Sequence, residues 1–323
     1  MTRVQRLLDR PIIGPDLDPS IGRNIQGPSL IRVPEWVEAP LGRYYLYFAD
    51  HKGSYIRLAY ADDLLGPWRV HVPGSLHLAE SHFPTQPPAL SAAQRADVEA
   101  RYAAGGVRIS HDPVTEATTP HIASPDVHVD EARRRIRMYY HGLEDVGRQV
   151  TRVAQSADGV RFAANAEVLS RSYLRAFAWD GWAYGLAMPG QLYRSRDGLT
   201  GFEAGPRLFN PDMRHAGLCL RDGTLHVFWT QVGHAPERIL LSMIDLRGDW
   251  QDWRESEAVE VLRPERPWEG AGAPTEPSVR STAYGQVNQL RDPAVYVEDG
   301  RTYLLYAVAG ESGVAIAEVL FDG

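Results

Sequence analysis

The sequence predicts an all-β protein with the architecture of a five-bladed β-propeller. The first observation is a unit that recurs five times in 323 residues: an apolar strand, a Gly-containing turn, an aromatic-rich strand, a polar loop and a third strand. The second is the richness of these strands in aromatic and β-branched residues. The third is the turn chemistry, as at Asp180-Gly181, Asp222-Gly223 and Asp299-Gly300. Four-stranded units repeated about an axis form a propeller.

Each blade can be followed from its first strand to its third. The expected strands are residues 28–33, 43–49 and 55–60; 125–129, 135–141 and 151–156; 174–178, 182–187 and 191–195; 217–220, 224–229 and 239–243; and 293–297, 302–308 and 314–318. Weaker fourth strands are expected near Trp68, Phe162, Phe202 and Trp253. The fifth blade stops after three strands, so another segment must complete it. We predict that Arg10 to Ile13 supplies this strand.

Residues 77–119 interrupt the repeat. Ser91 to Gln94 has the pattern of a capping box that opens a helix running to about Tyr102. We therefore expect a short helical insertion over one face of a single propeller domain that comprises residues 1–323. A second non-repeating stretch, residues 263–284, is rich in Pro and Gly and is expected to be an ordered loop.

Composition excludes several classes of function. The chain has 34 basic and 41 acidic residues, a formal charge of −7, and no basic cluster of the kind that binds nucleic acid. Its single cysteine, Cys219, excludes an intrachain disulfide and a thiolate zinc site. No apolar run approaches the roughly 20 residues that span a bilayer, and no signal-peptide pattern follows Met1. We expect a cytoplasmic protein without nucleic-acid or membrane partners; the sequence does not indicate its oligomeric state.

Two short elements carry a family resemblance. Ser124-Pro125-Asp126 opens the second blade, and Arg291-Asp292-Pro293 opens the fifth. With the five blades, they resemble the five-bladed propeller glycosidases, glycoside hydrolase family 43 and relatives such as family 117. In family 43 an Asp-Pro element of the first blade carries the general base, an Ala-Pro-Asp element of the second an orienting carboxylate, and a later Glu the general acid. This chain departs at two of these elements, with Gly27 at the base position and Arg214 to Gly217 in place of the acid element.

The candidate site residues come from equivalent places in the blades. Inner strands begin at one mouth of the axial channel, and the antiparallel second strands end there. Residues at the starts of the inner strands and at the ends of the second strands should therefore lie close together. Alignment on the Gly-anchored turn places Gly27, Ser124, Tyr173, His215 and Asp292 at one level. The catalytic candidates are Asp126, His215, Asp292 and Glu311. The substrate-binding candidates are Asn24, Gln26, Asp50, His51, Lys52, His141, Tyr173, Arg175, Arg214 and Arg291.

Lys52 is the only lysine among the 34 basic residues. A genome that favours Arg codons would explain this composition, but a flexible ammonium could also be required where a guanidinium does not serve. Lys52 falls at the predicted channel mouth. That position favours a functional role.

The resemblance implies a glycosidase, and inverting hydrolysis needs an acid and a base about 6.5 to 9.5 Å apart. We expect Asp292 to be the base, Glu311 or His215 the acid, and Asp126 a carboxylate that orients the substrate or raises the pKa of the acid. The substrate would be a short oligosaccharide or glycoside. Four cations could bind a carboxylate or sulfate on an acidic sugar: Lys52, Arg175, Arg214 and Arg291.

Several alternatives stay open. Asp126 and Asp292 could instead bond backbone amides at the starts of their strands. A polysaccharide or oligosaccharide lyase could use Tyr173 with His215, and the missing first-blade Asp favours a non-catalytic sugar-binding propeller. No cofactor is expected, although a central metal ion such as calcium would suit a histidine cluster. The histidines concerned are His51, His121, His128, His141 and His215, and the tryptophans that could stack on sugars are Trp36, Trp179, Trp182 and Trp268.

Overall fold

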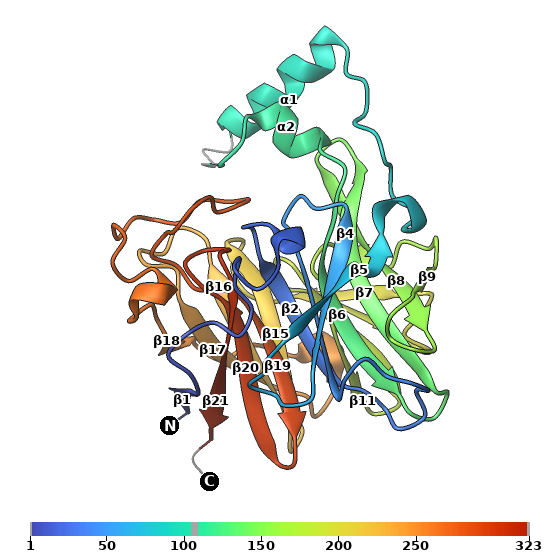
Figure 1. Cartoon of the computed structure of the whole chain (residues 1–323). Coiled ribbons are helices and arrows are strands. Elements are labelled where there is room, and N and C mark those ends of the chain that lie inside the picture. Colours follow the sequence, from blue (N-terminus) through green and yellow to red (C-terminus); the bar gives the residue numbers. More distant parts are fainter. Residues whose placement is uncertain (1, 105–108, 322–323) are drawn as a thin grey trace.

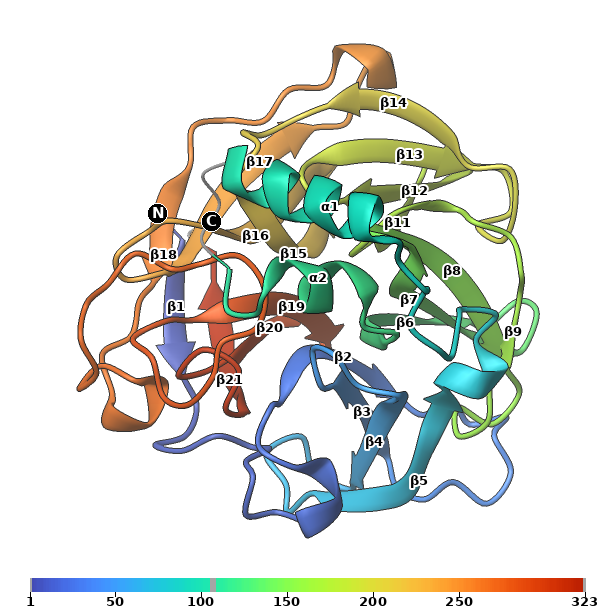
Figure 2. The same cartoon turned by 90° about the horizontal axis from the view of Figure 1, so that it is seen from above.

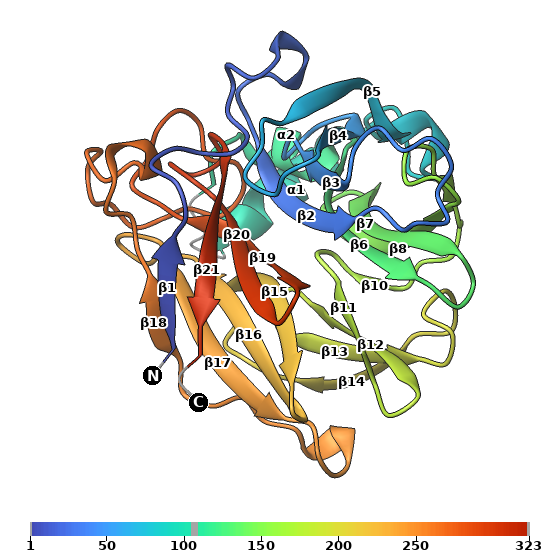
Figure 3. The same ribbon diagram turned by 60° about the horizontal axis from the view of Figure 1, so that its bottom comes forward.

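The computed structural model describes residues 2–104 and 109–321 and forms five antiparallel sheets around one axis (Figures 1 and 3). The first blade contains β2 (Gln26–Arg32), β3 (Tyr44–Ala49), β4 (Tyr55–Ala61) and β5 (Arg69–His77). The second contains β6 (Ile122–Asp130), β7 (Arg135–Asp145) and β8 (Arg148–Ser156), and the short β9 (Ala163–Ala164) and β10 (Ser170–Arg171) both pair with β8. These sheets confirm the predicted five-bladed propeller.

The other three blades follow the same plan. The third contains β11 (Arg175–Trp179), β12 (Trp182–Ala187), β13 (Gln191–Ser195) and β14 (Glu203–Arg207). The fourth contains β15 (Met213–Arg221), β16 (Thr224–Gln231), β17 (Ile239–Asp245) and β18 (Val259–Leu262). The fifth contains β19 (Arg291–Glu298), β20 (Arg301–Ala307), β21 (Val314–Leu320) and, from the other end of the chain, β1 (Arg3–Arg6). Single 3₁₀ turns lie at Pro19–Ile21, Leu78–Glu80, Trp250–Asp252 and Pro267–Glu269.

An N-terminal segment completes the fifth blade, as predicted, but the segment is a different one from the predicted Arg10 to Ile13. β1 pairs antiparallel with β21, and Arg3 lies opposite Leu320. The predicted Arg10 to Ile13 makes one bridge, between Ile13 and Val314. Pro11 lacks the N–H that a continuous ladder needs, which explains why the regular strand lies further toward the N-terminus.

A backbone bulge recurs where the inner strands begin. Gly27, Ser124, Tyr173 and Asp292 all have positive φ, between 48° and 62°. The register of the inner strand shifts at this level in the first, second, fourth and fifth blades. A bulge re-aims side chains locally. The repeated bulge confirms the predicted alignment of Gly27, Ser124, Tyr173 and Asp292. In the fourth blade the register places Arg214, and not the predicted His215, at the equivalent position.

Hydrophobic side chains fill the spaces between neighbouring blades. Between the first two blades, Tyr45 and Tyr47 are fully buried and share a cluster with Ile136 and Met138. The Tyr47 ring meets Phe162 edge-on, and its hydroxyl donates to the Gly159 carbonyl at 2.6 Å. These aromatic residues combine a large apolar contact with a satisfied polar group, which fixes the angle between the blades.

The insertion contains two helices, α1 (Ala92–Ala104) and α2 (Pro113–Thr118). The predicted capping box is confirmed, because Gln94 Oε1 accepts from the Ser91 N–H at 3.0 Å and Ser91 Oγ accepts from the Gln94 N–H at 3.3 Å. Seen from above, α2 lies over the middle of the propeller and α1 lies beside it (Figure 2). Neither of these described helices is long and apolar enough to cross a membrane.

Candidate active site

The axial channel has two mouths. The helical mouth is the end at which the inner strands begin and over which α2 lies, and it contains His215, Asp292 and Glu311. The open mouth is the opposite end, lined by the later residues of the inner strands, such as Arg32, Val129 and Glu298. The candidate site residues are divided between these two mouths.

Asp292 and His215 form an ion pair at the helical mouth, from neighbouring inner strands β19 and β15. Burial would raise the pKa of Asp292, but the charge and hydrogen bond of His215 outweigh that effect and lower it. Burial lowers the pKa of His215 although Asp292 opposes this. The pair engages Nδ1 of His215 and one oxygen of Asp292, Oδ1. It therefore leaves His215 Nε2 and Asp292 Oδ2 outside the contact.

Tyr173 lies between two imidazole rings. Its ring centroid is 3.9 Å from that of His141 and 4.3 Å from that of His215. Burial raises the pKa of the Tyr173 phenol, and the charge of Asp292 raises it further. Tyr173 therefore stays protonated and can donate a hydrogen bond.

One further histidine, His121, extends this stack, and its Nδ1 lies 2.8 Å from the Thr119 carbonyl oxygen. His121 meets His141 edge-on at 5.8 Å. Both ring nitrogens of His141, and Nε2 of His121, are buried without a hydrogen-bond partner among the described residues. Burial lowers the pKa of both rings, and that of His121 falls to about 3. Such unpaired buried nitrogens mark places where ordered water or a substrate hydroxyl can bind.

Glu311 accepts hydrogen bonds from three side chains. Its donors are Asn24 Nδ2 at 2.7 Å, Arg291 Nη1 at 2.8 Å and the His51 ring, whose Nδ1 lies 3.2 Å away. Burial would raise the pKa of Glu311, but the charges of His51 and Arg291 hold it well below its ordinary range. Glu311 is thus ionised, which is the wrong protonation state for the general acid that the sequence suggested as one of its roles.

The two arginines of the helical mouth are neutralised within the blades. Arg214 Nη1 lies 3.2 Å from Glu237 Oε2, and Arg291 bonds Glu311 and lies 3.5 Å from Glu237. Both arginines also donate to the Ser281 carbonyl, at 3.2 and 3.0 Å. Because their charges are already balanced, neither is free to bind an anionic substrate in this conformation.

The remaining candidates of the first blade lie at the same rim. Lys52 Nζ is 3.1 Å from Glu116 Oε1 of α2. Asp50 accepts from the Lys52 N–H at 3.0 Å, and Gln26, fully buried, accepts from the Ser124 hydroxyl at 3.2 Å. Sequence reasoning missed Glu116, which lies in the insertion rather than in a blade. The helix-start pattern Asp112-Pro113 is the signal that could have placed it.

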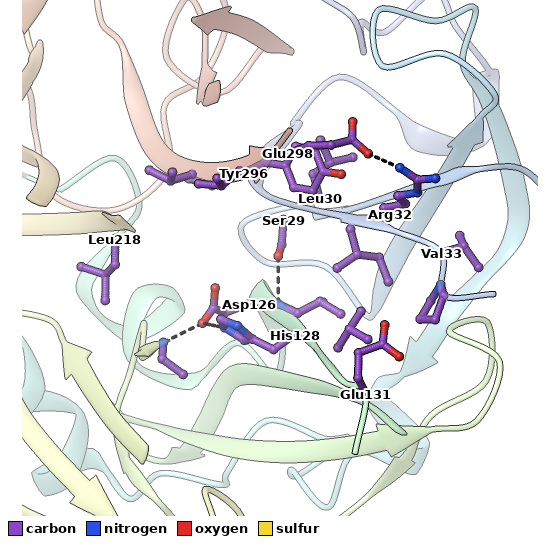
Figure 4. Close-up of a pocket in the computed structure, with 18 of the residues that line it drawn as sticks. Ser29, Leu30, Arg32, Val33, Asp126, His128, Glu131, Leu218, Tyr296 and Glu298 are labelled. Carbon is purple, nitrogen blue, oxygen red and sulfur yellow. Dashed lines mark hydrogen bonds and ion pairs between the residues drawn. The ribbon is translucent and has the colours of Figure 1, made fainter. Parts of the chain in front are cut away.

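Asp126 and Arg175 lie toward the open mouth, which corrects the expectation of a single cluster. They line a cavity of about 860 Å³ together with Ser29, Gly217 and Ala294 (Figure 4). Asp126 accepts from His128 Nε2 and from the Ala176 N–H, both at 2.7 Å, and lies 3.4 Å from Arg175 Nη1. A strand advances about 6.6 Å over two residues. Asp126, two residues after the bulge position Ser124, therefore lies one layer further along the channel, toward the open mouth.

The groups of the helical mouth are covered. Asp292 is 0%, Glu311 1% and His215 3% exposed. Beside them lies a cavity of about 780 Å³ whose wall includes Asn24, Tyr284 and Trp268. Because Asn24 bonds Glu311, this cavity approaches the charged cluster from the side, and Trp268 is the tryptophan of the four candidates that lines it.

The structure gives no positive indication of a metal site. Within residues 2–104 and 109–321, no group of three or more His, Cys, Asp and Glu side chains is arranged to hold an ion. His128 is at the open mouth, apart from the other four histidines considered for such a cluster. Cys219 is a buried free thiol.

Comparison with known proteins identifies a relative. No protein-family profile matches the sequence. The chain is 36% identical over 322 residues to the "Uncharacterized protein R118" of Acanthamoeba polyphaga mimivirus, an alignment that covers 92% of this chain and 83% of the viral protein. The chain belongs to the family of that viral protein.

Solved structures share the fold of this family member at low identity. A thermostable family-43 glycoside hydrolase has a TM-score of 0.54 and 14% identity, covering 93% of this chain and 90% of its own. A family-43 β-xylosidase/α-arabinofuranosidase from a compost microbial metagenome has a TM-score of 0.57 and 9% identity, covering 99% and 96%. The α-L-arabinanase of Cellvibrio cellulosa has a TM-score of 0.52 and 12% identity, covering 93% of both chains. This chain therefore shares the five-bladed propeller fold of these glycosidases.

Proposed function

We propose that this protein is a glycoside hydrolase that acts on a short oligosaccharide or glycoside at the helical mouth. The observation that carries the proposal is the ion pair of His215 and Asp292, contributed by two blades and set beside the ionised Glu311 in a fold shared with glycosidases. Such a constellation supplies both proton transfer and negative charge, which are the requirements of glycoside cleavage.

The pairing assigns the roles. Asp292 and His215 are in contact, so they act on the substrate from one side and do not have the spacing of the inverting acid and base expected from the sequence. Asp292 Oδ2, buried without a partner among the described residues, can accept a hydrogen bond from the attacking water. In its imidazolium form, which the charge of Asp292 favours, His215 can then pass the Nε2 proton to the leaving oxygen. The charge of Glu311 stabilises the positive charge that develops on the sugar.

Product analysis tests this function. The protein should release reducing sugar from one or more members of a panel of 4-nitrophenyl glycosides and short xylo-, arabino- and uronate-containing oligosaccharides. His215→Asn should lower kcat by about 10² to 10⁴, because a positioned proton donor contributes that much.

Three outcomes would contradict the proposal. An unsaturated product that absorbs in the ultraviolet would identify a lyase, in which Tyr173 or His215 abstracts a proton. Calorimetric binding of panel members without turnover would identify a sugar-binding propeller. Full activity of the His215→Asn variant on a hydrolysed substrate would remove the ion pair from the mechanism.

A further inference from the structure

Lys52 differs from the other candidate cations in the element that supplies its carboxylate partner. Arg214 and Arg291 are balanced by Glu237 and Glu311 at the helical mouth, and Arg175 lies at the open mouth. Lys52 is instead paired with a carboxylate from the inserted helix α2. It is therefore the cation whose counter-charge can leave without disturbing a blade.

Two donors hold that carboxylate from two sides. Lys52 Nζ contacts Oε1 of Glu116, and the Ser281 hydroxyl donates to Oε2. The side chains of Lys52 and Glu116 are 11% and 10% exposed. Since the Ser281 carbonyl accepts from Arg214 and Arg291, this position is joined directly to the network that holds Glu311. Lys52 and Ser281 thus form a built carboxylate site.

The insertion that supplies Glu116 is attached mainly through the last turn of α2, where Glu116, Ala117 and Thr118 are buried. Among the described residues of α1, Val98 is the one that is buried. The two helices pack on each other, and within the described residues neither makes an extensive contact with a strand. Their other links include the bond from the Gly147 N–H to the Ala117 carbonyl at 2.8 Å and a bridge between Ile109 and Arg280. Displacing Glu116 therefore requires opening one short helical turn, which costs less free energy than displacing a blade strand.

We propose that Lys52 and Ser281 form the substrate's carboxylate subsite, that the substrate therefore carries a uronic acid, and that Glu116 occupies this subsite when no substrate is bound. The inference rests on the proposed glycosidase function. A uronate that replaces Glu116 keeps a carboxylate against the ammonium. A neutral sugar that displaces Glu116 leaves Lys52 buried without a counter-charge, which is strongly unfavourable.

Calorimetric titration of the full chain tests the subsite. The probes are D-glucuronate and D-galacturonate, with D-glucose and D-galactose as their neutral counterparts. The variant Glu116→Gln removes the internal competitor while keeping its shape. It should bind one of the uronates on the order of tenfold more tightly than the unaltered chain does. Affinity for the neutral sugars should not change.

Matched variants isolate the role of each charge. Glu99→Gln removes an exposed carboxylate from α1 of the same insertion and should leave uronate binding unchanged. Lys52→Met should abolish the uronate binding seen in the Glu116→Gln background, and Lys52→Arg, which keeps the charge, should retain part of it. Thermal unfolding midpoints close to that of the unaltered chain show that these variants are folded.

Three results would overturn the inference: uronate affinity that Glu116→Gln does not raise, an equal gain for the neutral sugars, or tighter binding of galactose 6-sulfate than of galacturonate. The results that would refute the hydrolase function differ from those that would refute the subsite. Uronate binding that follows this pattern without any turnover would refute the hydrolase and keep the subsite. Hydrolysis of neutral glycosides without uronate preference would refute the subsite and keep the hydrolase.

Discussion

The two mouths of the channel are built by the same strands and differ in how their charges are used. At the helical mouth, buried carboxylates and cations pair with one another beneath α2, both between blades, as His215 and Asp292 do, and within one blade, as Arg291 and Glu311 do. At the open mouth, Asp126 pairs with His128 and Arg175 at the edge of a cavity of about 860 Å³. A step of two residues along an inner strand thus separates a covered charge network from an accessible cavity. Position in the repeat therefore does not by itself assign a catalytic role.

Removing a carboxylate should affect activity very differently at the two mouths. Asp292→Asn removes the charge that holds His215 and should lower kcat/KM by about 10³ or more. Asp126→Asn, at the open mouth, should lower kcat/KM less than tenfold. Steady-state kinetics on the substrate found by the panel measures both. Equal losses would show that the channel acts as one site.

Removing one charge of an ion pair should lower the free energy of unfolding more at the helical mouth than at the open mouth, because the pairs at the helical mouth are more deeply buried. Arg291→Met removes the buried guanidinium that pairs with Glu311, leaving His51 beside Glu311 and Arg214 beside Glu237, and should lower the free energy of unfolding by about 3 to 5 kcal/mol. Arg32→Met breaks the more exposed pair with Glu298 at the open mouth and should lower it by less than about 1 kcal/mol. Urea denaturation gives both values. A loss below about 1 kcal/mol for Arg291→Met would contradict the description of a covered network.

Gly27 tests the packing of the helical mouth at the level of the bulge. Its φ is +62°, and a Cβ there would lie 2.8 Å from Ser124 Cα. Gly27→Ala should therefore lower the free energy of unfolding by about 1 to 3 kcal/mol. Gly27→Asp should be destabilised at least as much and gain no activity. Gly14 is the matched control, because a Cβ added there would meet no described atom within 4 Å beyond its chain neighbours, and Gly14→Ala should change stability little. Denaturant unfolding distinguishes the two.

The stability of the helical mouth should also depend on pH, and the effect should grow gradually as the pH falls. Burial keeps His141 neutral in the folded state, whereas the unfolded chain takes up a proton below about pH 6.5. The stabilising contribution is complete above that pH and declines as the pH falls, by up to about 1.4 kcal/mol per pH unit. His141→Phe should flatten the stability profile between pH 6.5 and 4.5. His128→Phe, at the open mouth, should change it less; equal changes would show that burial of His141 is not the cause.

The blades could be predicted from the sequence because their signals are local. Aromatic strands and Asp-Gly turns repeat at intervals that no other fold class explains, and the bulge positions aligned for the same reason. The closing strand was misplaced because pairing between Arg3 and Leu320 has no local signature. Pro11 was the available warning against Arg10 to Ile13.

The candidate site was predicted only in part. His215, Asp292 and Glu311 meet because convergence at one mouth follows from the propeller geometry. Asp126 was assigned by its resemblance to a family motif, and the strand advance places it in the next layer. Glu116 was missed because it reaches Lys52 from 64 residues away through an insertion that the repeat cannot position.

Closure of the ring constrains how the chain folds. β1 leaves the ribosome before every other described strand, whereas its partner β21 leaves after all of them. Throughout synthesis β1 has no partner strand, and the face of the first blade that packs against the fifth is uncovered; unpaired strands and exposed apolar faces are sites of aggregation. A chain that has completed all five blades must still form a contact that spans them, which makes the last step of assembly slow.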